Sequence, residues 1–367
     1  MHRRHPHLAA FISAHGFGHA VRTAQVISRI PPAVGVTVFS RTPEAFLRAQ
    51  ITRPFDLVAA AFDCGTLHRP GQIEIDPQLT LARYLEVSRA NRAAADSQLA
   101  DLRRRGVTAI VADTPAFPLM LARQLAIPGL VIANFTWYEI YTPLVRDLPE
   151  GPAALAELAA QYRQASLALI TPLDIPMGLF TRPRRVPLIA RHGRRRPGDL
   201  RAAAGVPPDT HTFLLYAGNV PLPPQLWRRL AELPDTLFLC FDGQQPPPGQ
   251  PNVQTVSTLD FPVRDLVPSV SAVVAKAGYG ITSECMAAGT PLLYLHRNDF
   301  AESEAIAQAI AQWGGGIELP VTALQRLELA PYLERVLSMP HPRRLPASGD
   351  EVCAQILTEC AAGAATP

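Results

Sequence analysis

Apolar segments of strand length alternate with longer segments of helical period along this chain. In the first half, the apolar segments are "HLAAFI", "GVTVFS", "FDLVAA", "VTAIVAD", "GLVIAN" and "ASLALIT". Segments of helical period occupy 18–30, 79–105, 117–126 and 153–164. Strands that are buried on both faces have continuous apolar runs, and helices between them cover a parallel sheet. The first half therefore predicts a doubly wound α/β domain.

The second half begins the same alternation again, with the apolar segments "HTFLLYAG", "DTLFLCFDG", "VQTV", "AVVAKAG" and "PLLYLH". Between the halves, a stretch rich in proline and arginine keeps neither period. We predict two Rossmann-like doubly wound domains at 1–178 and 206–348, a linker at 179–205, and a C-terminal helix and tail at 349–367. Because ligands bind open α/β sheets outside the carboxyl ends of the strands, we expect the ligand in a central cleft that the two domains face.

The charge of the chain excludes some partners. Its 34 basic and 31 acidic residues give a net charge of +3, which is too small to indicate a nucleic acid as the main partner. Much of the positive charge is concentrated in "TRPRRVPLIARHGRRRPGDLR". That segment fits a solvated linker, and it also fits a patch that attracts phosphate or a membrane surface. No run of 18 uncharged apolar residues occurs, so we expect no transmembrane segment, while peripheral membrane contact remains open.

The cysteines and the amino terminus indicate a compartment. The five cysteines form no C-x-x-C pair and no spacing typical of zinc ligands, which predicts neither a metal site nor a disulfide framework. The amino terminus has basic residues but only a short apolar stretch and no small-residue cleavage site, so it is not typical of a signal peptide. We therefore expect a cytoplasmic protein with reduced thiols.

The first glycine-rich turn, "SAHGFGHAVR", follows the first predicted strand directly. Gly16 and Gly18 allow backbone N–H groups to approach an anion, and the amino terminus of the next helix favours negative charge. A dinucleotide fingerprint needs a third small residue where Val21 stands, and an acid where Ser40 and Arg41 end the second strand. The pattern therefore does not match NAD binding, and an NADP site with Arg41 at the 2′-phosphate remains an alternative.

A phosphate-binding turn does not explain the two histidines in this segment, His15 and His19. Both follow the end of a strand, and histidine can take a proton from a sugar hydroxyl near neutral pH. A hydrogen bond from either ring to the backbone is the structural alternative. Asp113, at the end of "VTAIVAD", is a second candidate base, and it fits equally well as the cap of the following helix.

Polar and aromatic side chains also follow another predicted strand, in "NFTWYEIY". Asn134 and Glu139 supply polar groups, and Trp137 supplies an aromatic face, so this segment can receive a sugar or a lipid-linked molecule. Packing of Trp137 in the core explains its presence equally well.

The second glycine-rich turn lies in "VVAKAGYGITSECMAAGTPLLYLHRNDFAESEA". Lys276 ends a predicted strand, a turn follows from Gly278 to Gly280, and a helix begins near Tyr279. A helix amino terminus stabilises a diphosphate through its N–H groups and its dipole. Glu284 lies about one turn further on, where a carboxylate can accept both hydroxyls of a ribose. An acid that the helix dipole alone favours is the alternative.

These motifs resemble those of a known family. "AKAGYGITSECMAAGTPLLYLHR" is similar to the donor-nucleotide motif of two-domain (GT-B) glycosyltransferases, including the enzyme that adds N-acetylglucosamine to form lipid II, and "SAHGFGHAVR" resembles the family's amino-terminal glycine loop. A more extensive resemblance, over nearly the whole chain, is to the glycosyltransferase-like amino-terminal half of L-arabinokinases. It rests on "HGFGHAVR", "FDCG", "VADTPAFPLMLARQLAIPGLVIANFTWYEIY", "AKAGYGITSE", "HRNDFAESE" and "PYLERVL". Nothing in the chain resembles the phosphate loop of the kinase domain that follows in arabinokinases, so sugar-kinase activity is not implied.

The resemblance implies a GT-B fold, with an acceptor domain at 1–178, a nucleotide-sugar donor domain at 206–348, and a C-terminal helix that crosses back onto the first domain. It places His19 near the reacting hydroxyl. The expected acceptor-binding residues are His15, Gly16, Gly18, Asn134, Trp137 and Glu139. The implied donor-binding residues are Gly218, Asn219, Lys276, Gly278, Tyr279, Gly280, Ser283, Glu284, Asp299 and Glu302. In that set, Glu284 binds the ribose, while Asp299 and Glu302 approach the donor sugar.

The expected function is transfer of a hexosyl or pentosyl group from a nucleoside-diphosphate sugar, with UDP as the expected nucleotide, to an unknown acceptor that is lipid-linked or small. Such a site must remove the acceptor proton and stabilise charge on the leaving diphosphate, which suits His19 and a helix terminus beside Lys276. The chain has no Asp-x-Asp motif, so we expect no metal ion, and no cofactor besides the donor. A nucleotide-sugar-binding module without turnover and a nucleotide-sugar epimerase are the alternatives.

Overall fold

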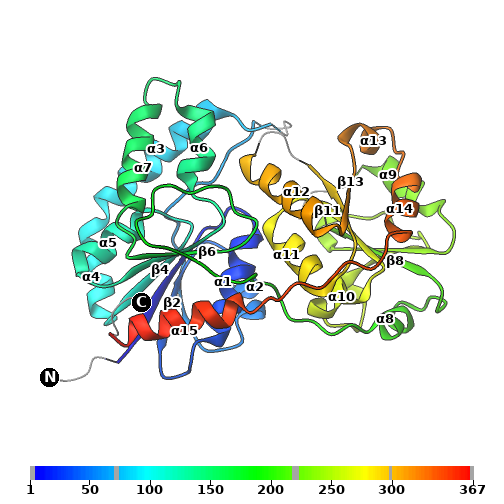
Figure 1. The fold of residues 1–367 in the computed structure, drawn as a ribbon, viewed down its shortest axis with the longest axis horizontal. Helices are drawn as coiled ribbons and strands as arrows, with labels where there is room; N and C mark the ends of the chain where they lie inside the picture. The colour runs from blue at the N-terminus through cyan, green and yellow to red at the C-terminus, as the bar shows by residue number, and fades with distance from the viewer. Residues whose placement is uncertain (1–4, 70–73, 217–222, 297–299, 364–367) are drawn as a thin grey trace. The chain divides into compact units, whose positions relative to one another are not determined.

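The computed structural model describes residues 5–69, 74–216, 223–296 and 300–363, and the chain forms two compact units. Unit 1 comprises Met1–Ile189, Asp299–Glu302 and Ala347–Pro367, and unit 2 comprises Ala190–Asn298 and Ser303–Pro346. Each unit contains one parallel sheet with helices packed on it, so the predicted α/β class with two Rossmann-like domains is confirmed (Figure 1). The break between Ile189 and Ala190 falls inside the segment that the sequence predicts to be a linker.

The sheet of unit 1 has the strand order β3-β2-β1-β4-β5-β6-β7, and all neighbouring strands are parallel. Its strands are β1 (His7–Ile12), β2 (Gly35–Phe39), β3 (Asp56–Val58), β4 (Ala109–Asp113), β5 (Gly129–Ala133), β6 (Leu167–Ile170) and β7 (Pro183–Arg185). Its helices are α1 (Phe17–Arg29), α2 (Glu44–Gln50), α3 (Pro77–Ala93), α4 (Ala95–Arg104), α5 (Phe117–Leu125), α6 (Trp137–Val145), α7 (Gly151–Tyr162) and α15 (Gly349–Ala361). The order reverses direction between β1 and β4, which is the switch point where open sheets bind ligands. The register pairs Ile12 with Asp113, so the segments that leave these two strands begin side by side.

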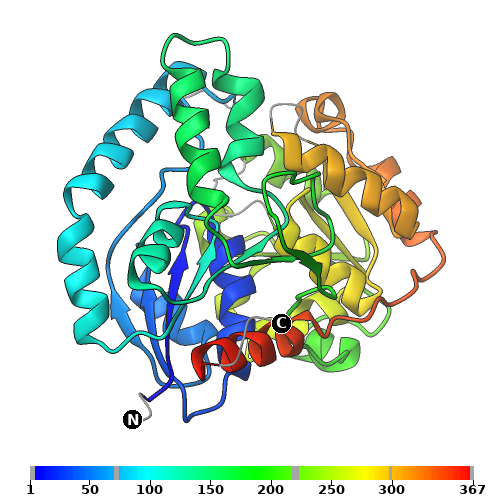
Figure 2. The same cartoon turned by 60° about the vertical axis from the view of Figure 1, so that its left-hand side comes forward.

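Different helices cover the two faces of this sheet. Successive strand residues point to opposite faces, so Ala10 packs in one core cluster with residues of α1, α2 and α15, and Ala9 packs in another with residues of α4 and α5. In Figures 1 and 2, α15 lies beside α1 on one side of the sheet. The C-terminal helix of the structure is α15, and it packs in unit 1, where Arg29 pairs with Asp350 at 2.9 Å.

The sheet of unit 2 has the order β10-β9-β8-β11-β12-β13 and is also parallel. Its strands are β8 (His211–Tyr216), β9 (Thr236–Cys240), β10 (Val253–Thr255), β11 (Ala272–Lys276), β12 (Leu292–Leu295) and β13 (Gly316–Glu318). The helices of this half of the chain are α8 (Pro197–Ala204), α9 (Pro224–Ala231), α10 (Leu266–Ser269), α11 (Tyr279–Ala288), α12 (Ala301–Trp313), α13 (Val321–Gln325) and α14 (Ala330–Leu337). The order reverses between β8 and β11, which is the switch point of this sheet.

Several elements differ from the sequence predictions. The predicted helix at 79–105 is two helices, α3 and α4, and the predicted linker at 179–205 contains β7 and α8. The elements that the sequence does not predict include α2, α6 and β13. β7 has the sequence Pro-Arg-Arg and is exposed at the sheet edge, so it has no apolar pattern from which a strand could be predicted. Backbone pairing with β6 and an ion pair of Arg185 with Asp174 hold it. α6 contains Pro143, which usually marks a helix boundary rather than an interior.

Candidate functional site

A histidine and an aspartate meet at the switch point of unit 1. Gly16 precedes α1 with a φ of 80°, a left-handed conformation that favours glycine, and it lets the chain turn sharply from β1 into the helix. A Cβ at Gly18 would have no atom within 4 Å, so this residue leaves open space in the first turn. His19 follows on α1, and its Nδ1 lies 2.8 Å from Oδ1 of Asp113, the last residue of β4. The switch point therefore carries a buried histidine–aspartate pair.

Buried groups donate to both carboxylate oxygens of Asp113. Arg22 donates from Nε to Oδ2 at 2.9 Å and from a terminal nitrogen to Oδ1 at 2.5 Å, and the Thr23 hydroxyl donates to Oδ2 at 2.6 Å. The Asp113 side chain is 0% exposed. Burial raises the pKa of Asp113, but the charge of Arg22 and the interactions with His19 outweigh burial and hold that pKa well below its usual range. Asp113 is therefore a carboxylate that only accepts hydrogen bonds.

An ionised Asp113 determines where His19 carries its hydrogen. Because the carboxylate has no hydrogen to donate, Nδ1 of His19 must donate to Oδ1. In the neutral ring, Nε2 then holds the lone pair that a general base needs. Asp113 itself is enclosed by donors, so its geometry fits the orientation of His19 better than direct removal of a proton. The alternative that Asp113 caps the next helix is wrong, because α5 begins at Phe117 without a side-chain cap.

Hydrogen bonds from α6 hold the segment between β3 and α3, near the pair of His19 and Asp113. Trp137 donates from its indole N–H to Oδ2 of Asp63 at 2.7 Å, and Tyr141 donates from its hydroxyl to the carbonyl of Gly65 at 2.7 Å. Burial raises the pKa of Asp63, against opposing hydrogen bonds from Trp137 and Ser13. Two helix side chains thus hold the "FDCG" segment against the sheet end that carries His19.

The predicted acceptor residues lie in different environments. The half-buried His15 ring meets the ring of Trp137 edge-on, with centroids 5.4 Å apart. Trp137 is 1% exposed, so in this structure it packs in the core of unit 1, as the structural alternative anticipates. Asn134 is 0% exposed. Glu139 accepts a hydrogen bond from the Thr136 hydroxyl, and burial raises the pKa of Glu139.

Gly65 holds His15 in place through close contact. It has a φ of 64°, and a Cβ on this residue would lie 2.0 Å from Nδ1 of His15. We expect Gly65→Ala to lower the free energy of unfolding by about 2–3 kcal/mol, because it adds backbone strain and pushes His15 aside. Gly106→Ala is the matched control, since Gly106 has a φ of 69° and a Cβ there would have no atom within 4 Å. Urea unfolding of both variants measures the difference, and equal losses would show that the contact with His15 has no energetic weight.

Glu302, which the sequence predicts to bind the donor sugar, contacts the same network. The residues Asp299–Glu302 belong to unit 1, and Oε1 of the largely buried Glu302 accepts from Nδ2 of Asn134 at 2.7 Å. Oδ1 of Asn134 in turn accepts from Arg22 at 2.6 Å. Arg22, Asn134 and Glu302 are therefore connected to the histidine–aspartate pair. Asp299 itself, and also Gly218 and Asn219, lie outside the described residues.

In unit 2, the predicted diphosphate turn lies at the switch point. Lys276 ends β11 and is exposed, and α11 begins at Tyr279 after Gly278. Among the described residues no side chain caps this helix, and a helix amino terminus favours an anion through its N–H groups and its dipole. Tyr279 is 6% exposed. The Ser283 hydroxyl donates to the carbonyl of Gly280 at 2.8 Å, so it is engaged within the helix.

Glu284, the predicted ribose ligand, is paired with an arginine that sequence reasoning missed. Arg191 donates from Nε to Oε1 at 2.6 Å and from a terminal nitrogen to Oε2 at 2.9 Å. The side chains are 16% and 6% exposed, respectively. Burial lowers the pKa of Arg191, but the charge and hydrogen bonds of Glu284 outweigh burial and raise that pKa. Arg191 lies in the arginine-rich segment, whose composition gives no signal that one of its members is buried.

A cavity of about 110 Å³ lies beside this ion pair in unit 2. Its lining combines the charged pair with apolar side chains of two helices, and comprises Arg191, His192, Gly193, Arg264, Val267, Pro268, Glu284, Ala287 and Ala288. Each Glu284 oxygen accepts one hydrogen bond from Arg191 and has capacity for a second. The paired carboxylate can therefore still accept two hydroxyl groups.

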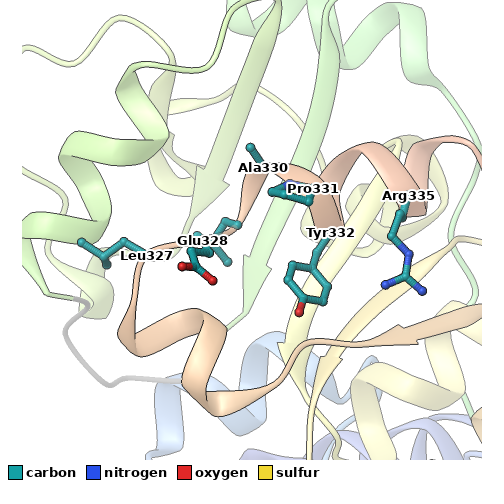
Figure 3. A pocket seen from close by; sticks show the side chains of 7 residues that line it. Leu327, Glu328, Ala330, Pro331, Tyr332 and Arg335 are labelled. Atoms are coloured by element: carbon teal, nitrogen blue, oxygen red, sulfur yellow. The ribbon is translucent and has the colours of Figure 1, made fainter.

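Another cavity in unit 2, of about 400 Å³, contains none of the predicted site residues. Figure 3 shows it where α13 leads into α14. It is lined by Leu327, Glu328, Leu329, Ala330, Pro331, Tyr332 and Arg335.

Over the described ranges of the chain, no helix is long and apolar enough to cross a membrane, and no group of three or more His, Cys, Asp or Glu side chains could hold a metal ion.

Two parallel sheets, each with predicted site residues at its switch point, define the class of fold: the chain has the GT-B fold of two-domain glycosyltransferases. The calicheamicin glycosyltransferase CalG4 has a TM-score of 0.60 and 18% identity, with 99% of this chain and 96% of that chain covered. A UDP-glucosyltransferase from Polygonum tinctorium has a TM-score of 0.63 and 16% identity, with 98% and 95% covered. MurG of Acinetobacter baumannii has a TM-score of 0.56 and 14% identity, with 96% and 99% covered.

In sequence, the chain is similar to one particular protein, L-arabinokinase of Arabidopsis thaliana. The two are 24% identical over 366 residues, which is 98% of this chain but only 35% of that protein. The chain thus spans about a third of the relative's length. This similarity supports the arabinokinase-like link that the motifs indicate. No protein-family model matches the chain.

Proposed function

We propose that this protein is a glycosyltransferase that moves a sugar from a nucleoside-diphosphate sugar to an acceptor hydroxyl, with His19 as the general base. The observation that carries the proposal is the buried pair of His19 and Asp113 at the switch point of a GT-B fold. In glycosyl transfer, such a pair can remove the proton of the acceptor hydroxyl, which attacks only as that proton is removed.

The roles follow from the charges. Asp113 holds the Nδ1 hydrogen of His19, so that Nε2 takes the acceptor proton as the new glycosidic bond forms and the bond to the diphosphate breaks. Asp113 also stabilises the imidazolium that results. The leaving diphosphate gains negative charge, and the uncapped start of α11 with the exposed Lys276 would stabilise it. In this proposal no metal ion is needed.

We propose that Glu284 recognises the ribose of the donor. Its carboxylate keeps two acceptor positions beyond its bonds to Arg191, which matches a vicinal diol. The donor is expected to be UDP-linked, because the structural neighbour from Polygonum tinctorium is a UDP-glucosyltransferase. A second candidate, a nucleotide-sugar-binding module without turnover, is favoured by one observation: the matched relative is a larger protein in which this region is about a third.

Thermal-shift titration with UDP, GDP, dTDP and ADP tests for the nucleotide site. A ligand at about 100 times its dissociation constant stabilises the folded state by about 2.7 kcal/mol, so one nucleotide should stand out. We expect Glu284→Gln to weaken that binding by about tenfold, or about 1.4 kcal/mol, through weaker hydrogen bonds to the ribose.

Two comparisons make this test specific. The exposed Glu318 of β13 provides the matched control, because Glu318→Gln removes the same charge from unit 2 away from α11. The 2′-deoxy form of the nucleotide should bind wild type more weakly but Glu284→Gln about as well as the ribose form. If none of the four nucleotides stabilises the protein, the donor site is contradicted. If Glu284→Gln lowers the affinity for the ribose and the 2′-deoxy nucleotide equally, Glu284 does not recognise the ribose.

A further inference from the structure

Arg22 is the buried cation of unit 1 that contacts both members of the histidine–aspartate pair. It lies three residues after His19 on α1, so both side chains leave the same face of the helix. Its guanidinium donates to both oxygens of Asp113, at 2.9 and 2.5 Å, and a terminal nitrogen lies 3.4 Å from Nδ1 of His19. The Arg22 side chain is 2% exposed. Neither water nor salt can therefore screen its charge effectively.

A third arm of the guanidinium fixes its orientation. The remaining terminal nitrogen donates to Oδ1 of Asn134 at 2.6 Å, and Asn134 donates onward to Glu302 at 2.7 Å. Planar, three-sided donation of this kind is specific to arginine, because lysine carries a single ammonium. The hydrogen-bond pattern therefore matches a guanidinium in one orientation, while its charge is a separate property that a lysine would share.

The charge of Arg22 opposes the charge of Asp113 beside the His19 ring. A buried carboxylate facing an imidazole alone would strongly favour the imidazolium, which has no lone pair with which to remove a proton. A permanent cation on the same carboxylate cancels most of that attraction and also repels a second positive charge nearby. A general base needs the neutral ring at the working pH.

The other titratable groups near this pair do not replace Arg22. Asp63 faces His19 from the segment before α3, but it is an acid, whose pKa burial raises, and it supplies no positive charge. Cys353 faces the network from α15, and burial raises the pKa of its thiol to about 12. Glu302 reaches the network through Asn134. The rings of His15 and His19 both lie near the ring of Trp137, with centroids 5.4 and 6.4 Å from it.

We propose that Arg22 is a positioning residue for the proposed reaction: its guanidinium holds the Asp113 side chain against His19 and offsets the negative charge that the His19 ring faces. This inference rests on the proposed role of His19 as a general base. It assigns a function to the third residue of the network, and it predicts that Arg22 sets the lower pH limit of the enzyme's activity.

The test compares Arg22→Gln, which removes the charge but keeps polar contacts, with Arg22→Lys, which keeps the charge. Thr23→Val removes a neutral donor from the same carboxylate, and Arg29→Met removes an arginine from the same helix outside the network. The histidine Cε1 resonances of ¹³C-labelled protein are titrated with pH, and the His19 signal is assigned by its loss in His19→Gln. Circular dichroism verifies that each variant is folded.

We expect the His19 signal of Arg22→Gln to titrate at a pH about one unit or more above that of wild type. Arg22→Lys, Thr23→Val and Arg29→Met should stay within about 0.3 units of wild type, since each keeps the nearby cation. An unchanged midpoint in folded Arg22→Gln, or equal shifts in Arg22→Gln and Arg22→Lys, would overturn the proposal.

The rate of turnover of the donor is a second, independent measurement. The acidic limb of the pH–rate profile should move upward in Arg22→Gln by the same amount as the resonance. A shifted resonance in a protein without any nucleotide-sugar turnover would contradict the proposed function and support the effect of Arg22 on His19. Normal turnover with unshifted profiles would support the function and overturn the role of Arg22.

Discussion

Replacement of His19 by alanine is expected to lower turnover of the nucleotide sugar by about 10³-fold, while the dissociation constant of the nucleoside diphosphate changes by less than about twofold. A positioned general base contributes about 10²- to 10⁴-fold to a proton-transfer step. Nucleotide affinity should persist because the proposed nucleotide ligands around Glu284 belong to unit 2, whereas His19 belongs to unit 1. Release of the nucleoside diphosphate at saturating donor, together with calorimetric titration, gives both quantities.

His211→Ala is the matched control for this experiment. His211 is exposed at the start of β8, so its loss should alter neither turnover nor binding. His19→Gln keeps a polar side chain on α1 and should be as inactive as His19→Ala. Turnover within about threefold of wild type in both His19 variants would remove His19 from the mechanism, whatever the fold.

Asp113→Asn is expected to have the largest effect on stability, lowering the free energy of unfolding by about 3–5 kcal/mol at pH 7. The change removes the anion from a buried site and leaves the guanidinium of Arg22 without its counter-charge. The amide also presents donor hydrogens toward Arg22 and Thr23, which themselves donate at this position. Urea unfolding of wild type and variant measures the difference.

The same contribution depends on pH in a defined direction. The folded pKa of Asp113 lies below its unfolded value of about 3.9, so the carboxylate stabilises the fold fully above about pH 5 and loses effect as pH falls. Wild type should therefore lose about 1 kcal/mol relative to Asp113→Asn between pH 6 and pH 3. A stability difference that stays constant over this range would contradict a depressed pKa for Asp113.

The sequence predicts the sheets well because their strands are buried on both faces. Five of the six apolar segments in the first half become β1, β2, β4, β5 and β6 nearly as predicted, and the sixth contains the short β3. Strands without an apolar pattern cannot be predicted in this way: β7 is Pro-Arg-Arg at a sheet edge, and polar interactions, namely its backbone hydrogen bonds to β6 and the Arg185–Asp174 ion pair, hold it. The helix α6 is also not predicted, because Pro143 and several aromatic residues interrupt the apolar period that would indicate a helix.

The candidate site is predictable only in part. The sequence indicates each of the two residues separately: His19 follows a glycine-rich turn, and Asp113 ends an apolar strand. Their partnership with Arg22 depends on the strand order, which places β4 beside β1 although Asp113 and Arg22 are 91 residues apart. Arg191 is similarly hidden, because only the folded chain distinguishes it from the exposed arginines that follow it.

Sugar transfer itself is measured by mass spectrometry of the products formed from nucleotide sugars and a panel of hydroxyl acceptors. The panel includes simple sugars, flat aromatic alcohols and a polyprenyl phosphate-linked sugar. The account predicts a nucleoside diphosphate together with an acceptor whose mass has increased by one sugar residue, and no such product from His19→Ala. Binding of the donor with no diphosphate released would contradict transfer and favour a binding module, and release of a free epimerised sugar would favour an epimerase.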